Sequence, residues 1–202
     1  MVGRRFYDSM YRRGAPWESG PRRELVDLVG SGRVTPGSPG RRAIDLGCGS
    51  GADCVYLADQ GFEVTGVDYS PVAIEKATAL AEASGVDVTL HVADLLALPD
   101  AIGGPFDLLF DGGTLDDFPR SKRPRVAEVY ERLARPGAVL VLWCFFARDE
   151  DLPRMSFQGP SRWGAPGIEP DELRALFEEG WEIEQVSGGI ETRHACFSLV
   201  RR

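Results

Sequence analysis

The chain has 202 residues, 43% of them apolar and 27% charged, a composition typical of one soluble domain with a sizeable core. Its net charge of −8 opposes a function based on binding nucleic-acid phosphates, and its longest apolar run, residues 138–147, is too short to span a membrane. No apolar signal segment is seen, and the four cysteines lack the spacing of a zinc site, so we expect no metal and a cytoplasmic location.

Residues 1–40 predict an N-terminal lid that precedes the core. Aromatic residues are scattered through a basic arm up to Trp17, the spacing over 23–29 predicts a helix, and residues 30–40 are rich in Gly, Ser and Pro. We expect the arm's arginines to form a solvated helix face.

Residues 43–51, AIDLGCGSG, predict a buried strand, a tight turn and the start of a helix. Gly47, Gly49 and Gly51 carry no Cβ, so the backbone can approach a ligand closely, and the free N–H groups of the next helix favour an anionic group. A nucleotide-like ligand is therefore expected here. The pattern fits the dinucleotide fingerprint G-x-G-x-x-G/A, and it also fits D-x-G-x-G-x-G, which begins at Asp45.

Two further acidic residues follow the next two strands. Strand 63–68 ends at Asp68, about the spacing at which a carboxylate binds ribose hydroxyls. Ser70 and Pro71 then predict a helix start, and Gly85 its end. Asp94 follows a strand over 87–92, so three acidic residues are expected near the glycine turn.

The remaining pattern alternates strands with helices. Strands are expected over 106–111 and 138–145 with a helix over 121–134 between them, and a helix over 170–179 precedes strands 181–187 and 195–201. This order predicts an α/β fold, a doubly wound, mostly parallel seven-stranded sheet with a C-terminal antiparallel strand. The core is expected over 41–202, with a substrate loop at about 147–169.

These motifs resemble the class I S-adenosylmethionine-dependent methyltransferases, which have a Rossmann-like fold. The first motif of that family has the form D-x-G-x-G-x-G, and Asp68 and Asp94 occupy its two later acidic positions. Residues 11–21, with Pro16, Trp17 and Glu18, and residues 106–111 resemble the thiol and halide (thiopurine-like) methyltransferases. The resemblance implies S-adenosyl-L-methionine as the cofactor and S-adenosyl-L-homocysteine as its product. The cofactor-binding residues it implies are Trp17, Asp45, Gly47, Gly49, Gly51, Asp68, Tyr69, Asp94, Leu95 and Asp111.

For the acceptor, the resemblance implies a small molecule, with a preference for S-methylation of a thiol. The small residues 112–114 leave room for a larger acceptor than a halide. A thiol needs little help to ionise, whereas a phenol needs a base, and Asp111, Asp116 and Asp117 are the available carboxylates. We expect Asp111 and Asp116 as catalytic residues; the expected substrate residues are Tyr11, Trp17, Thr114, Phe145, Phe146 and Trp163. His91 and His194 are expected to be structural.

Several alternatives stay open. The acceptor atom could be oxygen or nitrogen of a small aromatic metabolite or natural product, and a protein or RNA acceptor is disfavoured by the net acidity. The glycine turn also fits an NAD-dependent oxidoreductase, which would leave Asp94 without a role and predicts no terminal antiparallel strands. A non-catalytic cofactor-binding domain is the remaining alternative. The sequence does not predict the oligomeric state.

Overall fold

The computed structural model describes residues 3–37, 41–148 and 167–202. Their central feature is a seven-stranded sheet with the order β3-β2-β1-β4-β5-β7-β6. The strands are β1 (Arg42–Leu46), β2 (Glu63–Asp68), β3 (Val88–Val92), β4 (Phe106–Gly112), β5 (Ala134–Phe145), β6 (Trp181–Gly189) and β7 (His194–Arg201). Strands β1 to β5 pair in parallel, and β7 is antiparallel to β5 and β6. The predicted fold class is confirmed.

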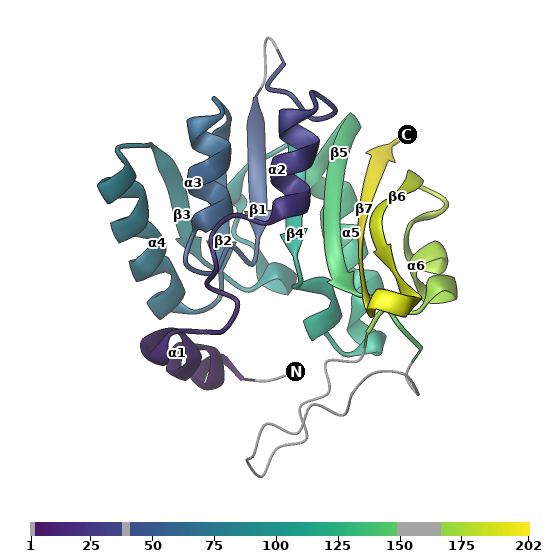
Figure 1. The fold of residues 1–202 in the computed structure, drawn as a ribbon, viewed down its shortest axis with the longest axis horizontal. Helices are drawn as coiled ribbons and strands as arrows, with labels where there is room; N and C mark the ends of the chain where they lie inside the picture. Colours follow the sequence, from purple (N-terminus) through teal and green to yellow (C-terminus); the bar gives the residue numbers. More distant parts are fainter. Residues whose placement is uncertain (1–2, 38–40, 149–166) are drawn as a thin grey trace.

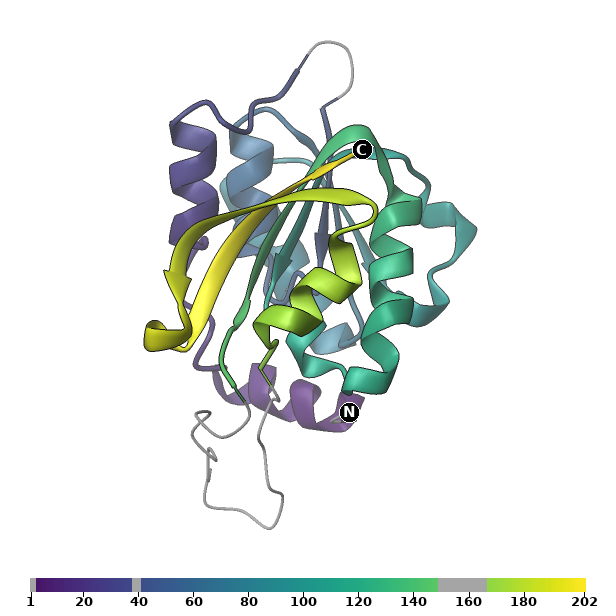
Figure 2. The ribbon, with the colours of Figure 1, turned by 90° about the vertical axis from the view of Figure 1, so that its right-hand side faces the viewer.

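Helices cover both faces of the sheet (Figures 1 and 2). One face carries α2 (Arg23–Gly30), α3 (Ala52–Asp59) and α4 (Pro71–Ser84), and the other carries α5 (Arg123–Leu133) and α6 (Pro170–Phe177). A separate buried apolar cluster fills the space under each set of helices, as a parallel sheet requires. None of the helices in the described ranges is long and apolar enough to cross a membrane.

Helix α4 begins and ends where the sequence predicts. The hydroxyl of Ser70 accepts a 3.2 Å hydrogen bond from the amide of Ala73, Pro71 occupies the first turn, and Gly85 ends the helix with φ of +68°. The same hydroxyl donates a 2.6 Å hydrogen bond to Asp8. The start of α4 therefore also anchors the N-terminal helix.

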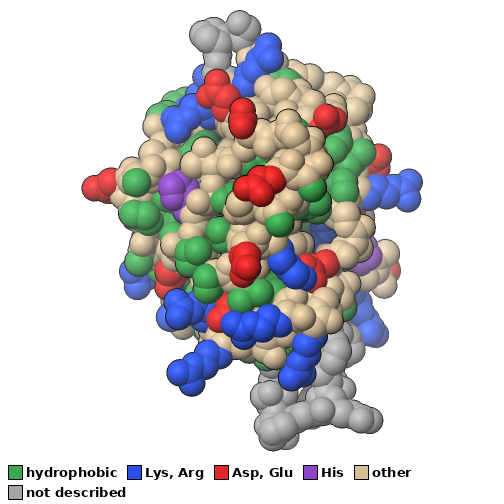
Figure 3. All heavy atoms as spheres, turned by 90° about the vertical axis from the view of Figure 1, so that its left-hand side faces the viewer, with side chains coloured by type: hydrophobic (Ala, Val, Ile, Leu, Met, Phe, Trp, Pro, Cys, Tyr) green, Lys and Arg blue, Asp and Glu red, His purple; other side chains and the backbone are tan. Residues whose placement is uncertain are grey.

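That N-terminal helix, α1 (Arg4–Arg13), lies beside the carboxyl ends of the parallel strands (Figure 1). Its buried residues Asp8 and Tyr11 face the domain. Its exposed basic residues are Arg4, Arg5, Arg12 and Arg13, and Figure 3 shows Lys and Arg side chains gathered at this end of the molecule. By contrast, α2 is packed in the cluster under α3, so within residues 3–37 it lies on a face of the sheet, whereas α1 lies at the strand ends.

Candidate active site

A cavity of about 500 Å³ lies between α1 and the carboxyl ends of β1, β2, β4 and β5. In a parallel sheet this edge is where the loops after each strand converge, and ligands of open α/β sheets bind there. The cavity is lined mostly by apolar surface and by six acidic residues. Those acidic residues are Glu18, Asp45, Asp53, Asp68, Asp94 and Asp117.

The glycine turn forms one wall of the cavity, and close contacts exclude a Cβ at each of its three glycines. Gly47 has φ of +88°, and a Cβ there would overlap the hydroxyl of Thr114. Gly49 has φ of +53°, and a Cβ there would lie 2.8 Å from the hydroxyl of Tyr11. Gly51 does not line the cavity; its close neighbour is Ala77, so it packs α3 against α4 rather than approaching a ligand.

The three acidic residues predicted around the glycine turn all line the cavity. Asp45 is buried and accepts a 3.2 Å hydrogen bond from the Cys54 thiol, and burial raises its pKa well above the ordinary value. Asp68 accepts hydrogen bonds from the amides of Gly49 (3.0 Å) and Ser70 (2.8 Å), and burial raises its pKa. Asp94 is exposed and caps the short turn after β3 through the Leu96 amide, at 2.9 Å.

Tyr69 and Leu95, the neighbours of these acidic residues, also line the cavity. The lining further includes Asp53, which the sequence analysis missed. Asp53 accepts a 2.6 Å hydrogen bond from the Arg22 amide, and burial raises its pKa to about 6. A carboxylate at the second residue of a helix that follows a glycine turn is a signal that could have been noticed.

The two residues expected to be catalytic do not reach the cavity. Asp111 is fully buried, and its carboxylate accepts hydrogen bonds from the hydroxyl of Tyr130 and from three backbone amides at 2.6–3.0 Å. The three amides belong to residues 113–115, so Asp111 holds the loop after β4 in place. This corrects the expectation that Asp111 points at the reacting end of the cofactor.

Asp116 is also buried, with 1% of its surface exposed, and is absent from the cavity lining. One carboxylate oxygen accepts a 3.0 Å hydrogen bond from the Phe145 amide, while the other has no hydrogen-bond partner among the described residues. Burial raises the pKa of Asp116 to about 8. It therefore ties the loop after β4 to the end of β5, and a catalytic role is not supported.

The carboxylate of this loop that does line the cavity is Asp117. The hydroxyl of Tyr7, on α1, donates a hydrogen bond to it. Burial raises the pKa of Asp117 to about 6. The adjacent residues Asp116 and Asp117 thus differ in direction: the turn over Leu115–Asp117 directs Asp116 into the core and Asp117 into the cavity.

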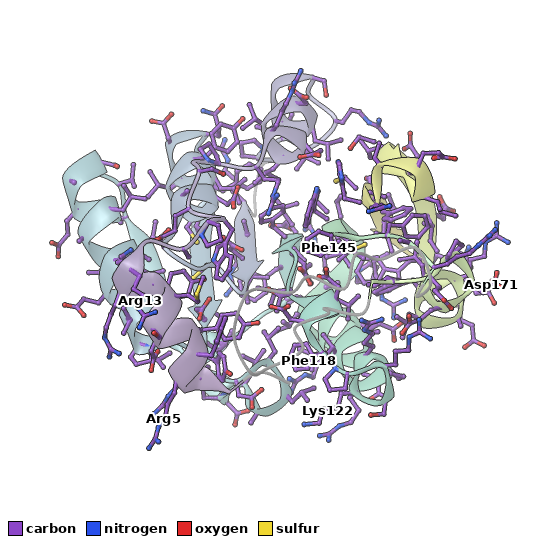
Figure 4. All side chains as sticks on the ribbon, turned by 60° about the horizontal axis from the view of Figure 1, so that its bottom comes forward. Arg5, Arg13, Phe118, Lys122, Phe145 and Asp171 are labelled. Carbon is purple, nitrogen blue, oxygen red and sulfur yellow. The ribbon has the colours of Figure 1, made fainter. Side chains whose placement is uncertain are left out.

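Asp117 and four other lining residues form what we call the acceptor wall, contributed by the loop after β4 and the end of β5: Thr114, Asp117, Phe118, Trp143 and Phe145. Figure 4, viewed toward this edge of the sheet, places Phe118 and Phe145 near its middle. The Arg22 guanidinium lies 4.0 Å from the centre of the Trp143 ring and donates a 2.9 Å hydrogen bond to the Gly112 carbonyl. Arg22 is thus a cation within a largely acidic cavity.

Phe146 does not belong to this wall. It is buried, packs against Phe197 and borders a different hollow beside α6 and β6, because successive residues of a strand point to opposite faces. Trp143, which the sequence analysis missed, lies on the same face of β5 as Phe145, two residues away, and packs against it with ring centres 5.4 Å apart. Trp163 and most of the expected loop 147–169 lie outside the described residues.

The segment after α1 covers the cavity on the side opposite the sheet. Trp17 donates a 3.2 Å hydrogen bond to the Tyr11 hydroxyl, and its ring packs edge-on against the Tyr11 ring. Glu18 accepts hydrogen bonds of 2.7 and 3.0 Å from Lys76 on α4. These contacts bring the predicted residues Tyr11 and Trp17 to the cavity, where both are part of the lining.

Neither histidine lines the cavity. His194 stacks on the face of Trp143, with ring centres 5.7 Å apart, and its Nδ1 lies 2.9 Å from the Thr192 carbonyl. Within the described residues, no group of three or more His, Cys, Asp or Glu side chains could hold a metal ion.

A doubly wound sheet of this order, with a glycine turn and three acidic residues at its carboxyl edge, defines a Rossmann-like nucleotide-binding domain. A family model described as a methyltransferase domain matches residues 38–179. The chain therefore belongs to the class I S-adenosylmethionine-dependent methyltransferases, and the predicted enzyme class and cofactor are confirmed. The thiol and halide subgroup remains a prediction.

Three similar proteins illustrate the family. The chain is 29% identical over 191 residues to a 2-heptyl-1-hydroxyquinolin-4(1H)-one methyltransferase of Mycobacteroides abscessus, covering 90% of this chain and 78% of that one. It is 34% identical over 140 residues to the yeast protein-lysine N-methyltransferase EFM4, covering 62% of this chain but only 59% of that protein. The structure reported in "Conversion of a Disulfide Bond into a Thioacetal Group during Echinomycin Biosynthesis" superposes with a TM-score of 0.74 at 30% identity, covering 98% of this chain and 90% of that one.

Proposed function

We propose that this protein methylates a small, flat and largely apolar molecule at an ionisable hydroxyl group. The observation that carries the proposal is the acceptor wall, where the rings of Phe118, Trp143 and Phe145 border the cavity beside one carboxylate, Asp117. Phe118 and Phe145 offer apolar surface to a flat ligand, whereas the Trp143 ring already contacts the Arg22 guanidinium at 4.0 Å and the stacked His194 ring.

The residues of the other wall fit the cofactor. The turn at Gly47 and Gly49 lines the cavity, with Thr114 and Tyr11 packed where the two Cβ atoms would stand, and Asp68 would accept hydrogen bonds from ribose hydroxyls. Asp94 would accept from the adenine amino group, and Arg22 supplies a positive charge for a carboxylate. When bound, the cofactor supplies a methyl group on a positively charged sulfur.

The protein's own contribution is placement. In-line displacement needs the acceptor atom aligned with the methyl group at close range, and two facing walls supply that alignment. The aromatic rings of Tyr11 and Trp17 cover the cavity and reduce the access of water. An aromatic surface also attracts a nearby cation, by about 0.5–2 kcal/mol.

A hydroxyl acceptor is favoured because one relative that covers 90% of this chain, the hydroxyquinolinone methyltransferase, is named for a hydroxylated aromatic compound. A thiol acceptor, preferred from the sequence, is the second candidate. It is supported by the similar structure whose report concerns the conversion of a disulfide bond into a thioacetal. The antiparallel strand β7 argues against the nicotinamide-dependent alternative.

The test is a matched pair of acceptors, 2-naphthol and 2-naphthalenethiol, with potassium iodide and a small aliphatic thiol for comparison. Release of S-adenosylhomocysteine and the mass of the methylated product would be measured after S-adenosylmethionine binding is verified by calorimetry. We expect turnover of the flat aromatic acceptors above the aliphatic thiol and iodide. Cofactor binding without turnover of either naphthalene compound would contradict the proposed acceptor class.

A further inference from the structure

We propose that Asp117 is the general base that removes the proton from the acceptor's hydroxyl, and that Tyr7 of α1 positions its carboxylate. This assignment rests on the proposed function and names the residue that would carry its proton step. It replaces Asp111 and Asp116, the candidates that the sequence favours.

The first argument is access. Among the three carboxylates after β4, Asp111 and Asp116 are enclosed, whereas Asp117 lines the cavity between Thr114 and Phe118. The other acidic lining residues belong to other elements: they lie on β1, on α3, at the end of β2, after β3 and on the segment after α1. Asp117 is thus the carboxylate of the acceptor wall.

The second argument is that the carboxylate is fixed in place from two sides. Tyr7 donates a hydrogen bond to Oδ2 of Asp117, which leaves Oδ1 to accept from a ligand hydroxyl. The fully buried guanidinium of Arg123 donates to the carbonyls of Asp116 (3.0 Å) and Phe118 (3.0 Å), the two neighbours of Asp117 in the chain. A base whose backbone and side chain are both held needs little reorganisation before it reacts.

The third argument is the charge around Asp117. Burial raises its pKa, the Tyr7 hydrogen bond lowers it, Asp111 of β4 raises it, Arg123 of α5 lowers it and Asp68 of β2 raises it. Tyr69 and Asp116 are also close enough to interact electrostatically with Asp117. The result is a pKa of about 6, so the group is mostly ionised at neutral pH yet a stronger base than an exposed carboxylate.

The proton step balances without another reactant. The hydroxyl proton passes to Asp117, and the electron pair of the O–H bond becomes available to form the new bond between oxygen and the methyl carbon. The carbon–sulfur bond breaks and its electron pair stays on sulfur, whose positive charge is thereby neutralised. The protonated Asp117 then returns its proton to solvent.

Tyr7 also links the base to the N-terminal helix. Burial raises the pKa of Tyr7 above its ordinary value of 10, so its hydroxyl stays protonated and remains a donor. Because Tyr7 lies on α1 and Asp117 on the core, the pair exists only while α1 covers the cavity. The position of helix α1 therefore determines whether the carboxylate of Asp117 is held in place by Tyr7.

The experiment compares Asp117→Asn and Tyr7→Phe with two matched controls that make the same chemical changes away from the cavity. The controls are Asp171→Asn and Tyr56→Phe. Asp171 lies at the exposed start of α6, at the periphery in Figure 4, and Tyr56 lies on α3, outside the cavity lining. Rates of methyl transfer to 2-naphthol and 2-naphthalenethiol would be measured from pH 5 to 9. Binding of S-adenosylhomocysteine by calorimetry verifies that each variant is folded and competent to bind.

For the wild type with 2-naphthol, we expect a rate that rises with pH and levels off above about pH 6. Asp117→Asn should lower the naphthol rate by about 100-fold or more and abolish this rise. The thiol, which ionises more readily, should lose less than about tenfold. Tyr7→Phe should lower the naphthol rate less than Asp117→Asn does, and both controls should stay within about twofold of wild type.

A second readout does not depend on turnover. In protein carrying ¹³C-labelled aspartate carboxyls, one signal that titrates near pH 6 should be absent in Asp117→Asn and should move to a higher pKa in Tyr7→Phe, since a lowering hydrogen bond is lost. An Asp117→Asn variant that keeps the naphthol rate and its pH dependence would overturn the base assignment. Failure of the wild type to methylate either naphthalene compound would overturn the proposed acceptor class, and this assignment with it.

Discussion

The carboxylate of Asp68, at the end of β2, accepts a 3.0 Å hydrogen bond from the backbone amide of Gly49, nineteen residues earlier in the chain. A second hydrogen bond, of 2.8 Å, comes from the Ser70 amide. The side chain predicted to bind ribose therefore also holds the glycine turn against the neighbouring strand. Ligand binding and the shape of the turn depend on one group.

Replacing Asp68 with Ala should weaken S-adenosylhomocysteine binding by at least tenfold, because the turn loses its anchor and the ribose loses its acceptor. Asp68→Asn keeps one carbonyl oxygen and should fall between wild type and Ala. Calorimetric titration measures the effect, with Asp87→Ala, an exposed aspartate before β3, as the control. Equal affinity of Asp68→Ala and wild type would remove Asp68 from the cofactor site.

Gly47→Ala should reduce both stability and cofactor affinity. The new methyl group meets the hydroxyl of Thr114 and the residue also has φ of +88°. The control is Gly85→Ala, which has φ of +68° but open space around the added carbon, so it carries only the backbone cost of about 1 kcal/mol. Urea unfolding should show a larger loss for Gly47→Ala, partly restored by Thr114→Ala. Equal losses for the two glycine variants would contradict the steric argument.

Tyr130→Phe should separate the structural role of Asp111 from ligand binding. Both side chains are fully buried, so removing the hydroxyl leaves a carboxylate oxygen without one of its donors, at a cost of about 2 kcal/mol. Because neither group reaches the cavity, S-adenosylhomocysteine affinity should change little at temperatures where the variant is folded. A large loss of affinity by a folded Tyr130→Phe variant would show that Asp111 acts on the ligand after all.

The pH dependence of stability should contain a contribution from Asp116. Its pKa is about 8 in the folded protein against about 3.9 in an unfolded chain, so between these values the folded state holds a proton that the unfolded state has lost. Stability should therefore fall as pH rises from about 4 to 8, by at most ~1.4 kcal/mol per pH unit for one proton. Asp53 and Asp117, with pKa values of about 6, contribute with the same sign up to that pH.

Asp116→Asn removes the largest of these contributions. The difference in free energy of unfolding, variant minus wild type, should be small near pH 4 and should increase as pH rises from 5 to 8. Urea denaturation across this range measures both curves. Parallel curves for the two proteins would mean that Asp116 is ionised in the folded state at all these pH values.

Much of the cofactor side could be predicted from the sequence because each of its signals is local. The glycines of residues 47–51, the capping pair Ser70 and Pro71, and the acidic residues at the end of β2 and after β3 are each recognised from a few neighbouring residues in the sequence. Parallel strands carry their carboxyl ends to one edge of the sheet, so these local signals also meet in space. The close contacts that exclude a Cβ at Gly47, Gly49 and Gly51 are tertiary and could not be predicted; their partners are Thr114, Tyr11 and Ala77.

The acceptor side could be predicted only in part. Alternation along β5 would have separated Phe145 from Phe146 and added Trp143, because side chains two residues apart share a face. No comparable rule orders Asp111, Asp116 and Asp117, which follow one strand within seven residues. Their directions depend on Tyr130 and Tyr7, which are distant in sequence, and on the burial of Arg123 under the same loop.

The sequence by itself determined the sheet, the family and the cofactor edge, since periodicity, capping and glycine turns are properties of short segments. The tertiary structure decided which carboxylate faces the cavity, because burial and hydrogen-bond partners come from helices α1 and α5 packing over the loop after β4. Charge and access at a site depend on what surrounds a side chain, and those surroundings exist only once distant segments meet.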